Sequence, residues 1–319
     1  MSLPIPILMK KLLFFGAGAL GCGIGYMLRD HETWFVGRKL MVDKINSEKM
    51  HVTGVDTGTL QGNAVTDIDD LNFKPDIVFI TTKAYDTEMA IKNISEKWSD
   101  LIIVSIQNGL NNYDTINKTL KTNWKGSPEK YIVMGITNHG FYIDQHGDLV
   151  HAGNGSMWIG SYQKTDSSGI VYDLFTSSRI NCILTDNIES IIWQKGIVNS
   201  IINPLTAILN VENGYLYNNQ NLALVIDELL KEGVGIANTL NINISLDEVR
   251  NMLFDTIKKS STNRSSMLRD IEMGRRTEIE EINGYIIKKG NFVKLKVIYN
   301  SLLYSLIRSM EELANKKRD

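Results

Sequence analysis

The segment Lys11-Leu12-Leu13-Phe14-Phe15-Gly16-Ala17-Gly18-Ala19-Leu20-Gly21 decides the fold of the first part of the chain. Its apolar start is typical of a buried strand, and the residues from Ala19 to Leu28 predict a helix. The glycines between them fit G-x-G-x-x-G, a pattern that is informative only when it follows a strand and opens a helix, as here. Gly16 permits a tight turn, Gly18 lets the backbone approach a pyrophosphate, and Gly21 allows close helix–strand packing. The predicted cofactor contacts in this loop are Gly16, Ala17, Gly18, Ala19, Leu20 and Gly21.

The rest of the first half repeats the same alternation of strand and helix. Apolar runs recur at residues 33–36, 76–80 and 101–106, and a helical stretch covers 85–98. Runs that are apolar throughout suit parallel strands covered on both faces. We therefore predict a Rossmann-like, doubly wound α/β domain over residues 1–186, which binds NADP.

From about Ile188 the apolar residues recur at helical spacing instead. Helices are expected at about 220–240, 246–259, 276–290 and 297–316. The second domain, residues 187–319, is predicted to be all-α and to carry the substrate-binding and catalytic residues. Its last helices are amphipathic enough to pack against their own domain or against a second copy of the chain. The sequence therefore leaves open whether the protein forms a homodimer.

Composition excludes several classes of protein. The chain has 319 residues, 43% of them hydrophobic and 22% charged, and a formal net charge of -2, which gives no basic surface for nucleic acid. Its two cysteines, Cys22 and Cys182, form no metal-binding pair, so no metal site is predicted and a reducing cytoplasm is expected. No apolar run reaches membrane-spanning length, and Met1–Pro6 lacks the features of a signal peptide, with the folded part expected to open at Met9.

The end of the second predicted strand bears on which nicotinamide dinucleotide the loop would hold. An NAD site usually places Asp or Glu there, to bind the ribose 2′-hydroxyl. This chain reads Trp34-Phe35-Val36-Gly37-Arg38 and has no carboxylate at that place. A guanidinium can bind a 2′-phosphate bidentately, so Arg38, assisted by Lys39, favours NADP. The alternative is a solvent-exposed surface arginine.

Polar residues follow the next strands, where ligands of open α/β sheets bind. Lys83 comes after the run 76–80, and Asn108 after the run 101–106. Lys83 could approach a cofactor phosphate or ribose, or a substrate carboxylate, and Asn108 could bind the nicotinamide end. Strands often end in polar turns, so position alone decides neither. His139 lies in a similar place, where a lone histidine is more often structural.

A polar stripe marks the first helix of the second half. Lys195, Asn199 and Asn203 are spaced i, i+4, i+8 and share one helix face, although their neighbours are strongly apolar. Buried amide and ammonium groups are costly without partners, so the stripe indicates a lined pocket. The alternative is a buried hydrogen-bond network with a purely structural role. Pro204 is expected to kink or interrupt this helix.

A second polar cluster covers residues 263–270 and 276–284. Its serines precede a predicted helix, and capping is the simplest explanation for them. Glu278 is one of four acids in a short stretch and, from composition alone, could be any solvated glutamate.

Four motifs together resemble the ketopantoate reductase family: GAGALG, TTKA with QNG, WQK…N…INPLTAI, and SSMLRDIEMGRRTEIEEINGY. Because the four motifs occur in the same order and at similar spacing as in that family, the resemblance covers the chain from about residue 10 to 310. It implies NADPH-dependent reduction of 2-dehydropantoate (ketopantoate) to (R)-pantoate, on the pathway to pantothenate and coenzyme A. Reductases of other small 2-oxo acids share this architecture, and a non-catalytic NADP-binding sensor is a third possibility.

The resemblance also implies roles for single residues. Lys195 matches the catalytic lysine of the family, and Asn199, Asn203, Asn213 and Ser266 match its substrate contacts. Asn108 and Glu278 match residues near the nicotinamide, and Lys83 matches a lysine of the cleft. An ammonium can stabilise the charge that develops on a ketone oxygen and supply its proton, and Glu278 could hold Lys195 charged and oriented.

Overall fold

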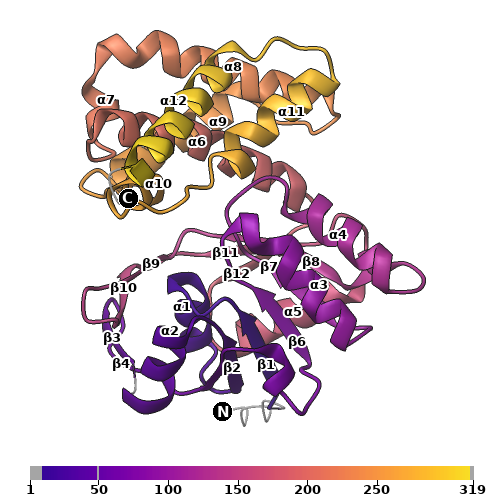
Figure 1. Ribbon diagram of the computed structural model, residues 1–319. Coiled ribbons are helices and arrows are strands. Elements are labelled where there is room, and N and C mark those ends of the chain that lie inside the picture. Colours follow the sequence, from indigo (N-terminus) through magenta and orange to yellow (C-terminus); the bar gives the residue numbers. More distant parts are fainter. Residues whose placement is uncertain (1–8, 49, 317–319) are drawn as a thin grey trace, which may run out of the picture. The chain divides into compact units, whose positions relative to one another are not determined.

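The chain divides into two compact units (Figure 1). This computed structural model describes residues 9–48 and 50–316, so the opening segment 1–8 lies outside the described residues. Unit 1 takes residues 1–107 and 112–188, and unit 2 takes residues 108–111 and 189–319. The segment 108–111 therefore folds with the helical part, although it follows a strand of the sheet.

Unit 1 is built on an eight-stranded sheet in the order β12-β11-β8-β7-β6-β1-β2-β5. All neighbouring strands are parallel except β8 and β11. Its strands are β1 (Lys11–Phe15), β2 (Glu32–Val36), β5 (Asn63–Val65), β6 (Ile77–Ile80), β7 (Ile102–Ser105), β8 (Ile132–Thr137), β11 (Met157–Gly160) and β12 (Cys182–Leu184). The helices of this unit are α1 (Ala19–Met27), α2 (Lys39–Asp43), α3 (Thr87–Lys97), α4 (Asn112–Asn123) and α5 (Asp166–Ser177). The predicted α/β fold is confirmed, and each predicted strand lies within two residues of an observed one.

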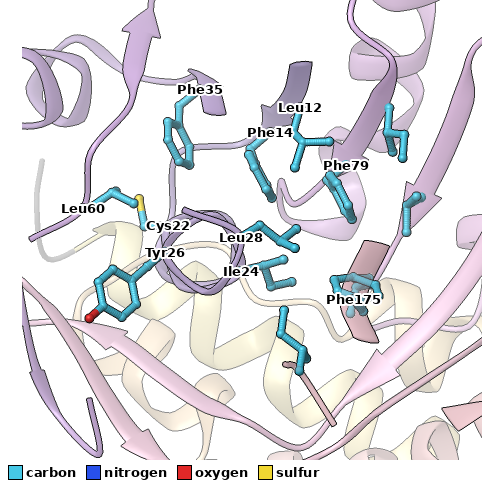
Figure 2. Packing of buried hydrophobic residues seen from close by; sticks show 14 of the residues in the cluster. Leu12, Phe14, Cys22, Ile24, Tyr26, Leu28, Phe35, Leu60, Phe79 and Phe175 are labelled. Carbon is cyan, nitrogen blue, oxygen red and sulfur yellow. The ribbon is translucent and has the colours of Figure 1, made fainter. Parts of the chain in front are cut away.

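Three aromatic rings hold the centre of this sheet (Figure 2). Phe14 on β1 pairs in register with Phe35 on β2 and Phe79 on β6, with ring centroids 5.1 and 4.8 Å apart. All three side chains are fully buried. A Cβ at Gly25 would lie 2.5 Å from the ring of Phe35, so a glycine is needed where α1 crosses the sheet. This ladder fixes β1 in place, and with it the loop that follows β1.

A second, four-stranded sheet was not predicted. Its order is β4-β3-β10-β9, with β3 (His51–Gly54), β4 (Gly58–Thr59), β9 (Gly140–Ile143) and β10 (Leu149–Gly153). The sheet packs on α1: the Tyr26 hydroxyl donates to the Thr57 carbonyl at 3.1 Å, and the ring of Phe141 lies against Gly23. Its strands are short and half exposed, and for β9 and β10 the helix they pack on, α1, is distant in sequence. No local sequence pattern therefore predicts these strands.

Unit 2 is helical, as predicted. Its helices are α6 (Ile188–Leu209), α7 (Tyr215–Asn218), α8 (Ala223–Thr239), α9 (Leu246–Lys259), α10 (Ser266–Glu272), α11 (Tyr285–Phe292) and α12 (Ile298–Lys316). The hydroxyls of Ser245 and Ser265 accept from the first turns of α9 and α10. The carboxylate of Glu232, on α8, accepts from the backbone N–H groups of residues 298–300 and so caps α12 from another helix. Among the described residues, no helix is long and apolar enough to cross a membrane.

The expected interruption at Pro204 is wrong, because α6 continues through it to Leu209. Proline has no N–H to donate to the carbonyl four residues earlier, which is that of Ser200. The buried amide of Asn283 donates to that carbonyl instead, at 3.0 Å. A tertiary hydrogen bond therefore replaces the helical one.

The helix expected from residue 276 begins later than predicted. It starts as a π-helical turn, Glu280–Gly284, which runs into α11. The backbone N–H of Thr277 donates to the Glu311 carboxylate at 2.7 Å, and that of Ile279 donates to the Thr277 hydroxyl at 3.2 Å. These side-chain acceptors hold residues 277–279 outside the helix.

Candidate active site

The glycine loop has the geometry that its sequence requires. Gly16 adopts a φ of 124°, and a Cβ there would lie 2.4 Å from the backbone nitrogen of Thr82. The N–H groups of Gly16 and Ala17 both donate to the Val36 carbonyl, at 2.9 and 3.0 Å. Gly18 then stands at the N-cap of α1, with no side-chain cap on that helix. The first N–H groups of a helix have no acceptor within it, so this turn is suited to an anion such as a pyrophosphate.

Two glycines of the loop give a matched pair of substitutions. A Cβ at Gly21 would lie 2.2 Å from the Gly16 carbonyl oxygen, whereas a Cβ at Gly18 meets nothing within 4 Å. We expect Gly21→Ala to lower the free energy of unfolding by about 1–3 kcal/mol, through overpacking. Gly18→Ala is expected to keep wild-type stability and to lose dinucleotide affinity, because its methyl group fills the space the phosphates need. Urea unfolding and a titration with NADPH measure the two effects, and equal stability of both variants would contradict this account.

Arg38 lies at the start of α2, directly after the strand that holds the glycine loop. A Cβ at Gly37 would lie 2.5 Å from that of Ala17, so the chain needs a glycine to bring Arg38 past the loop. Arg38 is exposed. Lys39 is exposed too, and its ammonium lies 3.2 Å from a carboxylate oxygen of Asp43. Arg38 is thus solvent-exposed and follows the glycine that contacts the loop, while Lys39 has an anionic partner in Asp43.

The ends of β6 and β7 are joined by a buried hydrogen-bond network. The Gln107 amide donates to the Thr82 carbonyl at 2.8 Å and to the Thr87 hydroxyl at 3.0 Å. The Thr81 hydroxyl donates to the Gly16 carbonyl at 2.8 Å. Lys83 follows these threonines in extended backbone and is partly buried. The network ties the end of β6 to the glycine loop, which fixes the backbone of Lys83 at that edge.

Asn108 belongs to unit 2, with the predicted catalytic lysine. The backbone N–H of Leu110 donates to the carbonyl of Glu281 at 2.9 Å. The side chain of Leu110 fills the space beside Gly196, where a Cβ would lie 2.4 Å from one of its methyl groups. The segment 108–111 is therefore held to the helix that carries Lys195.

The stripe on α6 is partly buried, as its apolar surroundings require. Asn203 is 7% exposed, and Lys195 and Asn199 are of intermediate exposure. Burial lowers the pKa of the Lys195 ammonium from 10.5 to about 8, and the negative charge of Glu278 opposes part of that shift. Glu278 itself is 7% exposed. The structure thus brings Lys195 and Glu278, which are far apart in sequence, close enough for the charge of Glu278 to act on Lys195.

Asn213 and Ser266 are placed differently from each other. Asn213 is 7% exposed; its amide donates to the Ser260 hydroxyl at 2.9 Å, and its carbonyl oxygen is buried without a hydrogen-bond partner among the described residues. Ser265, not Ser266, caps α10, and it also accepts from Thr206 at 2.8 Å. Ser266 is exposed, so its hydroxyl is open to a ligand.

Glu281 is a buried acid that the sequence did not single out. It is 4% exposed, and one carboxylate oxygen lies 3.4 Å from the guanidinium of Arg276. Burial raises the pKa of Glu281 from 4.5 to about 7; Arg276 opposes the shift, and Glu278 and Glu280 add to it. Its spacing of three residues from Glu278 is the only local signal, and that spacing is common on solvated helix faces.

Hydride-transferring oxidoreductases need two things that these units provide separately. One is a loop shaped for a dinucleotide, and the other is an acid that can part with its proton near neutral pH. Unit 1 supplies the loop, and Lys195 of unit 2 has a pKa in the right range. The class indicated is a dinucleotide-dependent oxidoreductase.

Comparison with known proteins identifies the family. Residues 12–164 match the family model "Ketopantoate reductase PanE/ApbA", and residues 187–311 match "Ketopantoate reductase PanE/ApbA C terminal". The chain is 33% identical to the 2-dehydropantoate 2-reductase of Pyrococcus horikoshii over 95% of its own length and 98% of that protein. It is 32% identical to that of Pyrococcus abyssi over 96% of its own length and 100% of that protein. The chain belongs to the ketopantoate reductase family and is an oxidoreductase.

Solved structures show the same fold. A PanE/ApbA family ketopantoate reductase from Ralstonia eutropha superposes with a TM-score of 0.85, over 96% of this chain and 99% of that one, at 23% identity. D-mandelate dehydrogenase, in a complex with NADH and anilino(oxo)acetate, superposes with a TM-score of 0.86 over the same shares, at 24% identity. These likenesses concern the fold of the chain.

Proposed function

We propose that this chain reduces 2-dehydropantoate (ketopantoate) to (R)-pantoate with NADPH, a step towards pantothenate and coenzyme A. The observation that carries the proposal is the partly buried Lys195, which shares one face of α6 with two asparagines. Burial lowers the pKa of its ammonium to about 8, and the charge of Glu278 opposes part of that shift. The relatives at 33 and 32% identity, both named 2-dehydropantoate 2-reductase, support the substrate. The buried thiols of Cys22 and Cys182 suit the cytoplasm as the place of this reaction.

The residues of unit 1 fit a bound NADPH. The open space at Gly18 and the first turn of α1 would receive the pyrophosphate, and Arg38 the 2′-phosphate. Lys83 would hold a phosphate or ribose oxygen. The family resemblance assigns Asn108 and Glu278, which belong to unit 2, to the nicotinamide end of the cofactor. When bound, the cofactor supplies the hydride that reduces the ketone carbon.

The residues of unit 2 do the remaining chemistry. Lys195 donates a hydrogen bond to the ketone oxygen, stabilises the charge that develops there, and gives up its proton. Asn199 and Asn203 offer neutral donors and acceptors for the hydroxyl and carboxylate of the substrate. Asn213 and Ser266 complete the substrate contacts; the buried carbonyl oxygen of Asn213, which has no hydrogen-bond partner in the part of the chain that the structure describes, could accept from a hydroxyl group of the substrate.

The charge of Glu278 is expected to set the pH range of the reaction. Reduction needs the ammonium form of Lys195, so its rate should fall as pH rises through about 8. Without the opposing charge of Glu278, the pKa of Lys195 is expected to fall further below its ordinary value. Glu278→Gln should therefore move this alkaline limb to lower pH and reduce kcat at pH 8 by roughly 10-fold.

The experiment is a pH profile of kcat for ketopantoate reduction, measured on both proteins. Glu280→Gln is the matched control, because Glu280 is exposed and accepts a hydrogen bond from Tyr304 on the neighbouring helix. It should keep the wild-type profile. An unshifted limb in Glu278→Gln would remove Glu278 from this role.

The surface of α12 favours a homodimer for the proposed enzyme. Ile298, Leu302 and Leu306 follow the spacing i, i+4, i+8 and are 63, 55 and 42% exposed. Apolar side chains in such a row are typical of a helix that packs against another protein surface. A second copy of the chain is the simplest partner for it.

A further inference from the structure

Two histidines and an aspartate of unit 1 form a hydrogen-bonded row that the proposed mechanism leaves unused. His139 lies in the turn between β8 and β9, and His151 lies on β10 and is 1% exposed. The Nδ1 atom of His139 is 3.1 Å from Nε2 of His151. The Nδ1 atom of His151 is in turn 3.0 Å from a carboxylate oxygen of Asp56. Each ring is therefore held through one nitrogen by the next member of the row.

The aspartate decides which ring nitrogens carry protons. A carboxylate only accepts, so Nδ1 of His151 carries a proton and donates to Asp56. With both rings neutral, Nε2 of His151 is then an acceptor, and Nδ1 of His139 donates to it. The Nε2 atom of His139 is left as an unprotonated acceptor. Burial is the main cause that lowers the pKa of His139 from 6.5 to about 4, and this keeps the His139 ring neutral.

That Nε2 atom is shielded from solvent and has no hydrogen-bond partner among the described residues. Leaving a buried acceptor unpaired costs free energy, so a hydrogen-bond donor that reached Nε2 after the covering atoms shifted would be stabilised there. The ring cannot turn away easily. The His139 ring stacks on that of Phe141, with the two ring centroids 5.9 Å apart, and Phe141 packs on Gly23 of α1. The backbone N–H of His139 also donates to the Thr137 hydroxyl, at 3.0 Å.

The order of strands places His139 relative to the proposed cofactor. Arg38 follows β2, Gly16 follows β1, Lys83 follows β6, and His139 follows β8. In the sheet these strands run β2-β1-β6-β7-β8, all parallel, so their carboxyl ends share one edge. A dinucleotide with its 2′-phosphate at Arg38 and its pyrophosphate at the glycine loop must extend its other half towards β6, β7 and β8. His139 stands at the end of that direction.

We propose that Nε2 of His139, oriented by His151 and Asp56, accepts a hydrogen bond from the nicotinamide riboside half of the cofactor. The donor is either the carboxamide NH₂ or a ribose hydroxyl. His139 is thus a cofactor-binding residue, and His151 and Asp56 are positioning residues that act through it. The inference rests on the proposed use of NADPH.

Calorimetric titrations of the full chain at pH 8 test this with three ligands. NADPH carries both donors, its 3-acetylpyridine analogue lacks the carboxamide NH₂, and 2′,5′-ADP lacks the whole nicotinamide half. His139→Phe keeps a ring to stack on Phe141 but removes the acceptor, and we expect it to weaken NADPH roughly 10-fold. It should bind 2′,5′-ADP like the wild type. His139→Gln, whose amide oxygen can accept, should weaken NADPH less than His139→Phe does, and His146→Phe, at an exposed histidine of the β9–β10 turn, should change nothing.

The outcomes separate the sources of the donor and the possible failures. If His139→Phe loses affinity for NADPH but not for the 3-acetylpyridine analogue, the donor is the carboxamide NH₂. If it loses affinity for both to the same extent, the donor is a ribose hydroxyl. Unchanged NADPH affinity in His139→Phe, or an equal loss of 2′,5′-ADP, overturns the inference. If the wild type binds 2′,5′-ADP and neither NADPH nor NADH, the proposed function itself fails.

Nitrogen NMR of the histidine side chains gives a readout that a purely structural role would not produce. Nε2 of His139 should be unprotonated in the free protein, and its resonance should move when NADPH binds. A proton on Nε2 in the free protein contradicts the inference.

Discussion

Replacing Lys195 by alanine is expected to lower kcat for ketopantoate reduction by roughly 10²-fold or more, while NADPH binding survives. This is the scale on which a general acid contributes to catalysis. The effect is expected on kcat because the ammonium matters most when charge develops on the ketone oxygen. Stopped-flow measurement of a single turnover gives the chemical step directly.

Two further variants make this result specific to the proton. Lys195→Met keeps the length of the side chain and should be as impaired as Lys195→Ala. Lys231→Ala is the matched control, since the exposed Lys231 of α8 pairs with Asp227 and Glu228 on its own helix. Turnover of Lys195→Ala within a few-fold of the wild type would refute the assignment.

Replacing Arg38 by alanine should raise the KM for NADPH by roughly 10- to 100-fold and leave the KM for NADH nearly unchanged. Hydrogen bonds to charged groups contribute about 1.5–3 kcal/mol, and only NADPH carries the 2′-phosphate that the guanidinium would bind. Arg38 is exposed and directly follows Gly37, which packs closely against Ala17 of the glycine loop. This position leaves room for the 2′-phosphate beside the guanidinium.

The control for Arg38 is Arg29→Ala, at an arginine of the same unit that lies over the ring of Tyr26, 4.5 Å from its centroid. It should leave both cofactors unaffected. Equal losses of NADPH and NADH in Arg38→Ala would mean that Arg38 does not distinguish them.

The α/β fold of unit 1 could be predicted because its signals are local. Strands that are buried on both faces are apolar throughout, and the glycine pattern needs only six consecutive residues to state its geometry. The stripe of Lys195, Asn199 and Asn203 was visible for the same reason, since one helix sets its spacing.

Features that depend on distant residues were missed or predicted wrongly. Pro204 does not break α6, because the amide of Asn283 bonds the carbonyl that proline leaves unpaired. The association of residues 108–111 with the helical unit includes the backbone hydrogen bond from Leu110 to Glu281 and the fit of Leu110 against Gly196. The pairing of His139 with His151 joins the turn between β8 and β9 to β10, a strand of a sheet that no local pattern predicts.

The most direct test of the proposed function is the consumption of NADPH by the purified chain with ketopantoate, beside a panel of other small 2-oxo acids. We predict turnover with ketopantoate at a kcat/KM well above that of every other acid, and (R)-pantoate as the product. A higher kcat/KM with another 2-oxo acid would contradict the substrate, and tight NADPH binding without turnover of any acid would contradict catalysis altogether.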